Sequence, residues 1–205
     1  MAMVDLLTVF TTLFVIIDPI GLTPIFVALT PDRTFRERRN IAFQASLSAL
    51  CILVLFSHFG ENVLLALGIE MVAFQISGGI LLFIIALEML FQKRAERRKK
   101  NAIDELPNPA IFPLSTPLIA GPGALAAVVL ISNNSSKHVV DIIWINLIIL
   151  IVIFMVFISF LLGNALEKLI GKTGIDLISR ILGMLLASLS VQIIINGFKS
   201  LGLVP

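Results

Sequence analysis

Long apolar stretches separated by short polar segments dominate this chain of 205 residues and leave little room for a soluble fold. A helix that crosses the hydrocarbon core of a bilayer needs about 20 apolar residues. Stretches of that length occur at about 3–31, 39–60, 64–91, 111–132, 139–163 and 175–198. We predict a short turn near Gly60-Glu61-Asn62 between the second and third stretches, and a Gly/Lys turn at 163–174 between the last two. Charged residues make up only 14% of the chain, whereas a soluble domain has about 25%. We therefore expect an all-α polytopic membrane protein with six transmembrane helices.

The first and fourth stretches carry a similar interruption by proline and glycine. One contains Asp18-Pro19-Ile20-Gly21-Leu22-Thr23-Pro24, and the other contains Thr116-Pro117-Leu118-Ile119-Ala120-Gly121-Pro122-Gly123. Proline lacks a backbone N–H and clashes with the preceding helical turn, so both segments are predicted to unwind inside the membrane. Unwound backbone at that depth must face protein or a water-filled cavity. Breaks at corresponding positions of two halves point to the binding site of a transporter.

A basic linker at 92–110 separates residues 1–91 from residues 111–205, and each half contains one of the two breaks. Each half holds three predicted spans, and an odd number of spans makes two duplicated halves inverted relative to each other. The third spans align weakly, Gln75-Ile76-Ser77-Gly78 with Arg180-Ile181-Leu182-Gly183, and coincidence in Leu/Ile-rich sequence is an alternative. We predict one membrane domain built from two inverted three-helix repeats, with helices 1 and 4 broken by Pro and Gly.

Lysine and arginine are concentrated in alternate loops. The loops after spans one, three and five contain Arg33, Arg36, Arg38, Arg39, Lys93, Arg94, Arg97, Arg98, Lys99, Lys100, Lys168 and Lys172. The opposite side has only Lys137 and Lys199, with Arg180 set aside because it lies just inside the sixth span. Cytoplasmic loops carry the excess of basic residues, so we expect these three loops in the cytoplasm and both termini outside.

Asp18 is the most informative polar residue within a span. A carboxylate at membrane depth is costly and normally faces a partner or water. It could also cap the second half-helix through the N–H of Gly21 or Leu22, and the two roles are compatible. Thr116 takes the equivalent place in the second half as a neutral cap. The breaks would offer an acid, hydroxyls and peptide groups, which suits a small zwitterion. The predicted substrate- or ion-binding residues are Asp18, Gly21, Thr23, Thr116, Gly121 and Gly123, and the helix-breaking residues are Pro19, Pro24, Pro117 and Pro122.

Other polar and small residues in the spans have two readings, a pathway or helix packing. Small residues let helix backbones approach closely in lipid, and polar side chains hydrogen-bond across helices. His58 lies near Glu61 at the end of the second span, where an interfacial position is favoured over a proton relay. The residues with both readings are Gln75, Ser77, Gly78, Gly79, Arg180, Gly183, Gln192 and Asn196.

Motifs of catalysis and metal binding are missing from the sequence. It has no Walker A loop, no His/Cys set with metal-ligand spacing and no Gly-x-Ser-x-Gly elbow. We expect neither enzymatic activity nor a metal site nor a bound cofactor. Active transport would then have to use a gradient of H⁺ or Na⁺.

Three blocks of the chain resemble the signature blocks of the MarC family. They are Asp18 to Phe26, Ser77 to Phe83, and Pro113 to Ala124, and the resemblance covers nearly the whole chain. It implies a bacterial inner-membrane protein, and some relatives are classed as transporters of small neutral amino acids. No settled set of substrate-binding residues comes with the resemblance, so the residues named above rest on their own chemistry.

Secondary transport of a small polar metabolite, such as a neutral amino acid, is the favoured function. A membrane module that partners or regulates another protein is the alternative, and direct drug efflux is a weaker one because the predicted site is small and polar. We expect the lipid bilayer and a small-molecule substrate as partners, and no nucleic acid. The small-residue faces of the spans also allow a homo-oligomer.

Overall fold

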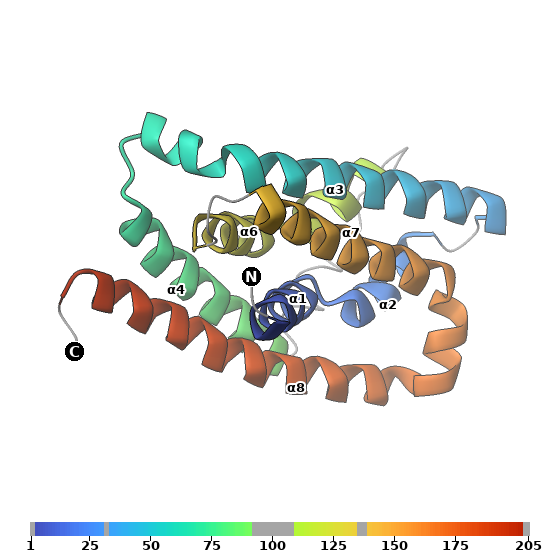
Figure 1. The fold of residues 1–205 in the computed structure, drawn as a ribbon. Coiled ribbons are helices and arrows are strands. Elements are labelled where there is room, and N and C mark those ends of the chain that lie inside the picture. Colours follow the sequence, from blue (N-terminus) through green and yellow to red (C-terminus); the bar gives the residue numbers. More distant parts are fainter. Residues whose placement is uncertain (1–2, 31–32, 92–108, 135–138, 203–205) are drawn as a thin grey trace.

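The computed structural model describes residues 3–30, 33–91, 109–134 and 139–202, and all regular structure in these ranges is helical (Figure 1). Its elements are α1 (Met3–Ile17), α2 (Pro19–Leu29), α3 (Phe35–Ala66), α4 (Met71–Leu90), η1 (Ala110–Ile119), α6 (Pro122–Asn134), α7 (Val139–Leu161) and α8 (Gly163–Ser200). The basic linker predicted at 92–110 lies outside the described residues except for its last two positions.

Five helical segments of the described chain are long and apolar enough to cross a membrane. They are Leu6–Leu29, Phe35–Ala66, Met71–Leu90, Val140–Leu161 and Thr173–Ser200. The pair Ala110–Ile119 and Pro122–Asn133, bent by 55°, makes a sixth if it forms one span. The chain is therefore an all-helical integral membrane protein with five or six spans, as its apolar stretches predicted.

Two pairs of long helices enclose the broken segments. α3 packs along α7, and α4 packs along α8 more extensively than any other pair of elements. Figure 1 shows α1 and α6 nearly end-on between these two layers, so they cross the long helices steeply. α1 also contacts α6 directly. Asp18 and Gly121, at the two breaks, are therefore covered by protein, whereas Phe112 and Thr116 in the earlier part of the second interrupted segment are exposed.

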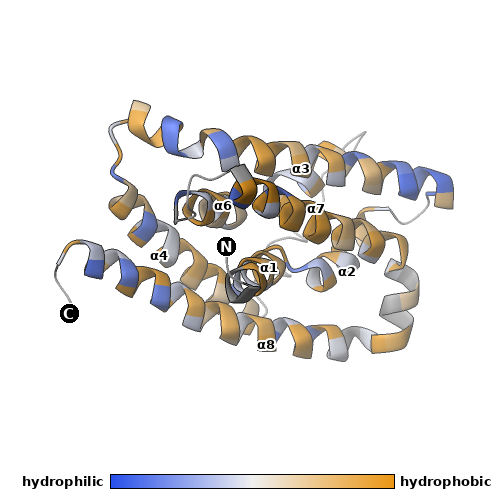
Figure 2. Cartoon of the chain, in the orientation of Figure 1, coloured by the Kyte–Doolittle hydropathy of each residue, from blue (hydrophilic) through white to orange (hydrophobic). Residues whose placement is uncertain are grey.

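Small and aliphatic side chains fill the interior, and large apolar ones face outward. Ala42, Ala45 and Ala49 are fully buried on one face of α3, where small side chains let neighbouring helices approach closely. Phe154 on α7 is 59% exposed, and Figure 2 shows apolar residues over the outer faces of α7, α8 and α4. Such a surface would be an aggregation hazard in water but is the normal one in lipid.

The turn after the second span differs from the prediction. The sequence suggested a turn near Gly60-Glu61-Asn62, but α3 continues to Ala66. Gly68 ends it with φ 70°, while the N–H of Ile69 bonds the Leu64 carbonyl at 2.9 Å. This is the Schellman arrangement, in which a glycine adopts the left-handed conformation just beyond the helix. Gly60 instead lies inside α3 and packs closely against Val129 of α6. A Cβ built on Gly60 would collide with the valine side chain.

The turn predicted at 163–174 is also mostly helical. α8 begins at Gly163, directly after α7, and its helical dihedrals are interrupted at Gly171 (φ 70°, ψ 164°). Only glycine adopts that combination without strain. The last membrane-spanning segment accordingly begins at Thr173. Glycine therefore reverses the chain between the last two spans, as Gly68 does between α3 and α4.

Candidate substrate site

Asp18 is the single residue between α1 and α2. It adopts the left-handed conformation (φ 57°, ψ 66°), which Asp tolerates better than most residues other than glycine. Its Oδ1 accepts a hydrogen bond from the Gly21 N–H at 3.0 Å, so the predicted N-cap is confirmed. The residue is only 2% exposed. A carboxylate is thus held in the protein interior at the positive end of a half-helix dipole.

Gly21 has no room for a side chain because of this cap. A Cβ built on Gly21 would overlap the Asp18 carboxylate, with Oδ2 as the closest atom. The neighbouring Thr23 is fully buried, and its hydroxyl donates to the Pro19 carbonyl at 3.0 Å. Pro19 is the first residue of α2, a position that needs no backbone N–H, while Pro24 lies inside this helix. The first break is therefore confined to Asp18. The Thr23 hydroxyl forms its hydrogen bond within α2.

Substitution of Gly21 by Ala should displace the Asp18 carboxylate and break its cap. We expect the free energy of unfolding to fall by about 1–2 kcal/mol, the cost of a lost N-cap and local overpacking. Thermal unfolding of the purified protein in detergent measures this. In an Asp18→Ala background the same substitution should be neutral, because the clashing atoms are gone. An equal loss in both backgrounds would contradict the proposed contact.

The second break is longer and differs in form. Within η1, Phe112 (φ −126°, ψ 127°) and Thr116 (φ −130°, ψ 125°) have extended backbone, and the next helix starts only at Pro122. Thr116 is exposed and is separated from that start, so its predicted role as the neutral cap equivalent to Asp18 is wrong. Gly121 is the residue directly before the second half-helix. The second half therefore has no side-chain acid or hydroxyl where the first has Asp18.

Two glycines at the second break, Gly121 and Gly123, lie in close contact with neighbouring atoms. A Cβ on Gly121 would lie 2.5 Å from the Pro117 carbonyl oxygen, which belongs to the backbone. A Cβ on Gly123 would lie 2.6 Å from Ile85 Cδ1 and 3.7 Å from Ile16 Cγ2. Ile16 is two residues before Asp18, so the start of α6 lies against the end of α1. The structure thus brings the two interrupted segments together in the interior.

Most of the remaining predicted residues serve contacts between or within helices. The Gln75 side chain donates to the Ile193 carbonyl of α8 at 3.3 Å. Gln192 and Asn196 were expected to bond neighbouring helices, but their side chains bond each other at 3.0 Å on an exposed face of α8. The Ser77 hydroxyl donates to the Phe74 carbonyl within α4, and Arg180 is exposed. None of these hydrogen bonds involves Asp18.

The glycines of the third and sixth spans are packing positions. A Cβ on Gly79 would lie 3.1 Å from the Ser190 carbonyl oxygen, and one on Gly183 would lie 3.2 Å from the Ala86 carbonyl oxygen. These two glycines bring α4 and α8 into close contact. A Cβ on Gly78 would lie 3.4 Å from the Cβ of Ala126 in α6, which is an ordinary van der Waals distance.

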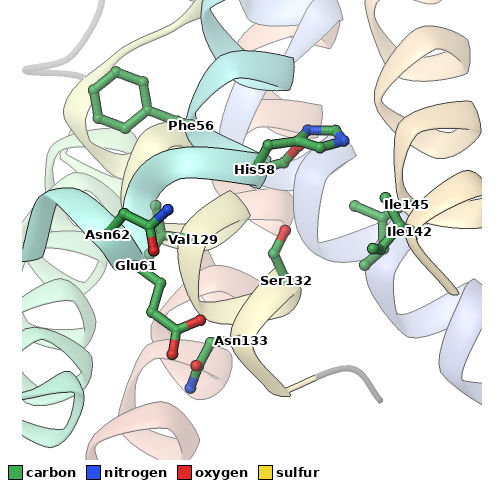
Figure 3. Close-up of a pocket in the computed structure, with 10 residues that line it drawn as sticks. Phe56, His58, Glu61, Asn62, Val129, Ser132, Asn133, Ile142 and Ile145 are labelled. Carbon is green, nitrogen blue, oxygen red and sulfur yellow. The ribbon is translucent and has the colours of Figure 1, made fainter. Parts of the chain in front are cut away.

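A polar cavity of about 270 Å³ is the feature that sequence analysis missed. We call it the polar chamber (Figure 3), and it lies where the later part of α3, the end of α6 and the start of α7 meet. The sequence predicts a turn at 60–62, which would not place Glu61 and Asn62 beside α6. In the structure α3 continues through these residues and brings their side chains next to α6. Its lining is Phe56, Ser57, His58, Glu61, Asn62, Val129, Ser132, Asn133, Ile142 and Ile145.

A second cavity of about 480 Å³ adjoins the chamber and shares Phe56 and Val129 with it. It lies between α3, α4 and α6 and reaches Pro122 at the start of α6. Ser77 is the one hydroxyl-bearing side chain in its lining. Such a cavity suits hydrocarbon better than a polar solute.

Comparison with known proteins gives one consistent relationship. Residues 3–201 match the family described as MarC family integral membrane protein. A UPF0056 membrane protein of Methanocaldococcus jannaschii is 34% identical over 193 residues, which cover 93% of this chain and 94% of that protein. A UPF0056 membrane protein of Buchnera aphidicola is 34% identical over 192 residues, covering 94% and 90% respectively. No solved structure gives a significant match.

Proposed function

The chain belongs to the MarC family of integral membrane proteins, and on this premise we propose that it is a secondary transporter of a small polar metabolite, such as a neutral amino acid. The observation that carries the proposal is Asp18, a carboxylate 2% exposed at a break in a membrane-spanning segment. Burial of an ionisable group in a membrane protein is costly and marks an ion or substrate pathway by default. Transport would proceed by alternating access between two inverted halves.

Contacts between the halves support the inverted arrangement. The second spans of the two halves, α3 and α7, pack together, and so do the third spans, α4 and α8. The mixed contacts also come in matching pairs, since α2 contacts α7 as α6 contacts α3, and α2 contacts α8 as α6 contacts α4. A two-fold relation between the halves would produce this pattern.

Glycine positions support the same relation at the level of single contacts. Gly60 packs on Val129 of the opposite half, and Gly163, 103 residues later, packs on Val27 of the first half. Gly68 and Gly171 are also 103 residues apart, and each has φ 70°.

The contacts between α4 and α8 repeat with nearly the same spacing. Gly79 and Gly183 are 104 residues apart, and so are the residues whose carbonyl oxygens they approach, Ala86 and Ser190. Two sets of contacts whose spacings, 103 and 104 residues, differ by one residue favour duplication over coincidence.

This spacing gives a different register from the proline pattern. It relates Pro19 to Pro122, each the first residue of a half-helix, and therefore relates Asp18 to Gly121. The two halves would then contribute unequally to the site. The acid in one half would contact a substrate ammonium group or the coupling ion, H⁺ or Na⁺, and the glycine in the other would leave room for the solute. The protein would sit in a bacterial inner membrane with both termini outside.

Uptake of labelled glycine, alanine and serine into proteoliposomes tests the proposal. Imposed proton or sodium gradients should drive accumulation above that of empty liposomes, and dissipating the gradient should abolish it. Folded protein that takes up none of the three in either gradient would refute coupled import of these amino acids. Recovery of a stoichiometric membrane partner from such preparations would instead favour a regulatory module.

A further inference from the structure

Two phenylalanine rings meet across the boundary between the two halves. Phe26 of α2 stacks on Phe160 of α7, with ring centroids 4.4 Å apart and ring planes at 5° to each other. The two residues are only 1% and 3% exposed. Beside them, Gly163 at the start of α8 packs on Val27, since a Cβ built on this glycine would lie 2.9 Å from Val27 Cγ2. Close apolar contacts therefore hold the end of α2 against the second half.

The corresponding place in the other half holds the polar chamber. With the spacing of 103 residues, Phe26 corresponds to Val129 and Phe160 corresponds to Ser57. Both counterparts line the cavity of about 270 Å³. The chamber lies at the start of α7 and Phe160 lies near its end, so the two places are at opposite ends of this helix. Two stacked rings thus fill the space at one end, whereas a valine and a serine border a cavity at the other.

The ring pair stands between Asp18 and the end of α2. Asp18 precedes the first turn of this helix, and Phe26 lies about 12 Å further along it, at a rise of about 1.5 Å per residue. Thr23 lies between them and is fully buried. A solute or ion moving from Asp18 toward the end of α2 would therefore have to pass the two rings.

A second contact ties the end of α2 to its own half. The Arg38 guanidinium of α3 donates to the Thr30 carbonyl from Nη2 at 2.6 Å and from Nε at 2.9 Å. Both residues belong to the first half, so this contact does not cross the boundary between the halves. Movement of the first half as one body would carry α2 with α3 and separate Phe26 from Phe160.

From these observations we infer that Phe26 and Phe160 form a gate between the halves, which closes the path from Asp18 to the side on which α2 ends and parts once in each transport cycle. The inference rests on the proposed function and on the spacing of 103 residues. Alternating access requires one end of the path to be closed while the other is open. In the orientation expected from the basic loops the closed end faces the cytoplasm.

Thiol labelling behind the gate tests whether the rings are the barrier. Cys51 is the one cysteine of the chain, so Cys51→Ser gives a cysteine-free background. Thr23→Cys adds a reporter at a fully buried position. A charged, water-soluble thiol reagent should label this reporter slowly in the full-length protein in detergent. Phe160→Ala should raise the labelling rate at least tenfold, because it removes one ring of the stacked pair.

Matched controls separate opening of the gate from loss of the fold. Phe154→Ala removes a ring of the same helix that is 59% exposed and should leave the labelling rate unchanged. Ser190→Cys is an equally buried reporter at the contact of α8 with α4, and Phe160→Ala should not change its labelling. Phe160→Leu keeps an apolar side chain and should give a smaller increase at Thr23→Cys. It keeps the test decisive should Phe160→Ala fail to fold.

A disulfide across the same contact tests whether the gate has to part. Val27→Cys and Gly163→Cys place two thiols within reach, because a Cβ on Gly163 would lie 2.9 Å from Val27 Cγ2 and the Cβ atoms of a disulfide are about 3.5–4.5 Å apart. In the Cys51→Ser background, oxidised protein should lose gradient-driven uptake of labelled glycine, alanine and serine, and a reductant should restore it. Each single-cysteine variant should take up these solutes equally with and without oxidant.

Two results would overturn the gate: labelling of Thr23→Cys that neither Phe160 variant accelerates, or uptake that the disulfide leaves unchanged. Failure of the proposed function gives a different pattern. Faster labelling in Phe160→Ala without uptake by any variant would refute transport of the tested solutes and keep the two rings as the barrier beside Asp18. Normal uptake by disulfide-linked protein would keep transport and refute the gate.

Discussion

Replacement of Asp18 by Asn should reduce gradient-driven uptake to the level of empty liposomes while the protein stays folded. The amide oxygen of Asn can accept the Gly21 N–H as Oδ1 does, and Asn tolerates the left-handed conformation as well as Asp does. The substitution therefore removes charge and little else. A charge-assisted contact contributes roughly 1.5–3 kcal/mol, or about 10–100-fold in affinity.

The matched control for this prediction is Asp18→Ala. Alanine removes the cap, which lowers the free energy of unfolding by about 1 kcal/mol. Its left-handed backbone conformation costs about 1–2 kcal/mol more. Thermal unfolding should therefore separate the two variants, with Asn within about 0.5 kcal/mol of the wild type. Normal uptake by Asp18→Asn would leave Asp18 as a structural cap only. Loss of membrane insertion in Asp18→Asn would contradict the expectation that charge is its only deficit.

The number and position of the spans were predictable because a run of apolar residues long enough for lipid has few other solutions. The Asp18 cap was predictable for a similar reason, since an acid before proline at a helix start satisfies local donors. Both signals depend on neighbours in sequence. Long-range contacts decide the features that were predicted wrongly.

Gly60 and Gly68 illustrate the difficulty. One lies inside a helix against Val129, and the other ends that helix in the left-handed conformation. Glycine is required at both for different reasons, but the sequence around Gly60, with Glu61 and Asn62, has the stronger turn composition. Placing the turn at Gly60 removed Glu61 from helix α3 and so concealed the polar chamber. Only the packing of α3 on α6 distinguishes the two glycines.

Proline spacing predicts a different alignment of the halves from the one that the glycine contacts favour. Proline is accepted at the first position of a helix and also inside an irregular segment, so Pro19, Pro117 and Pro122 look alike in sequence. The contacts of Gly163 with Val27 and of Gly60 with Val129 favour a register near 103 residues, which residue identity alone does not suggest. Thr116 was consequently paired with Asp18, although Gly121 stands before the second half-helix.

A series of glycine-to-alanine variants at the second break should show a graded loss of stability. At Gly121 the obstructing atom is the Pro117 carbonyl oxygen at 2.5 Å, which cannot move without the backbone. At Gly123 it is the tip of the Ile85 side chain at 2.6 Å, which can change rotamer, and at Gly78 the nearest atom is 3.4 Å away. Overpacking typically costs about 1–3 kcal/mol, whereas alanine in an unobstructed helix gains about 0.5–1 kcal/mol over glycine.

We therefore expect Gly121→Ala to lower the free energy of unfolding by about 3 kcal/mol and Gly123→Ala by about 1 kcal/mol. Gly78→Ala, the control for a buried glycine with space, should match or exceed the wild type. Thermal unfolding in one detergent gives this order. Because Gly121 lies at the 55° bend between η1 and α6, its variant should also lose uptake at temperatures where it remains folded. Equal stability of all three variants would mean that close backbone approach does not set the bend, and the second break would then owe its shape to its prolines.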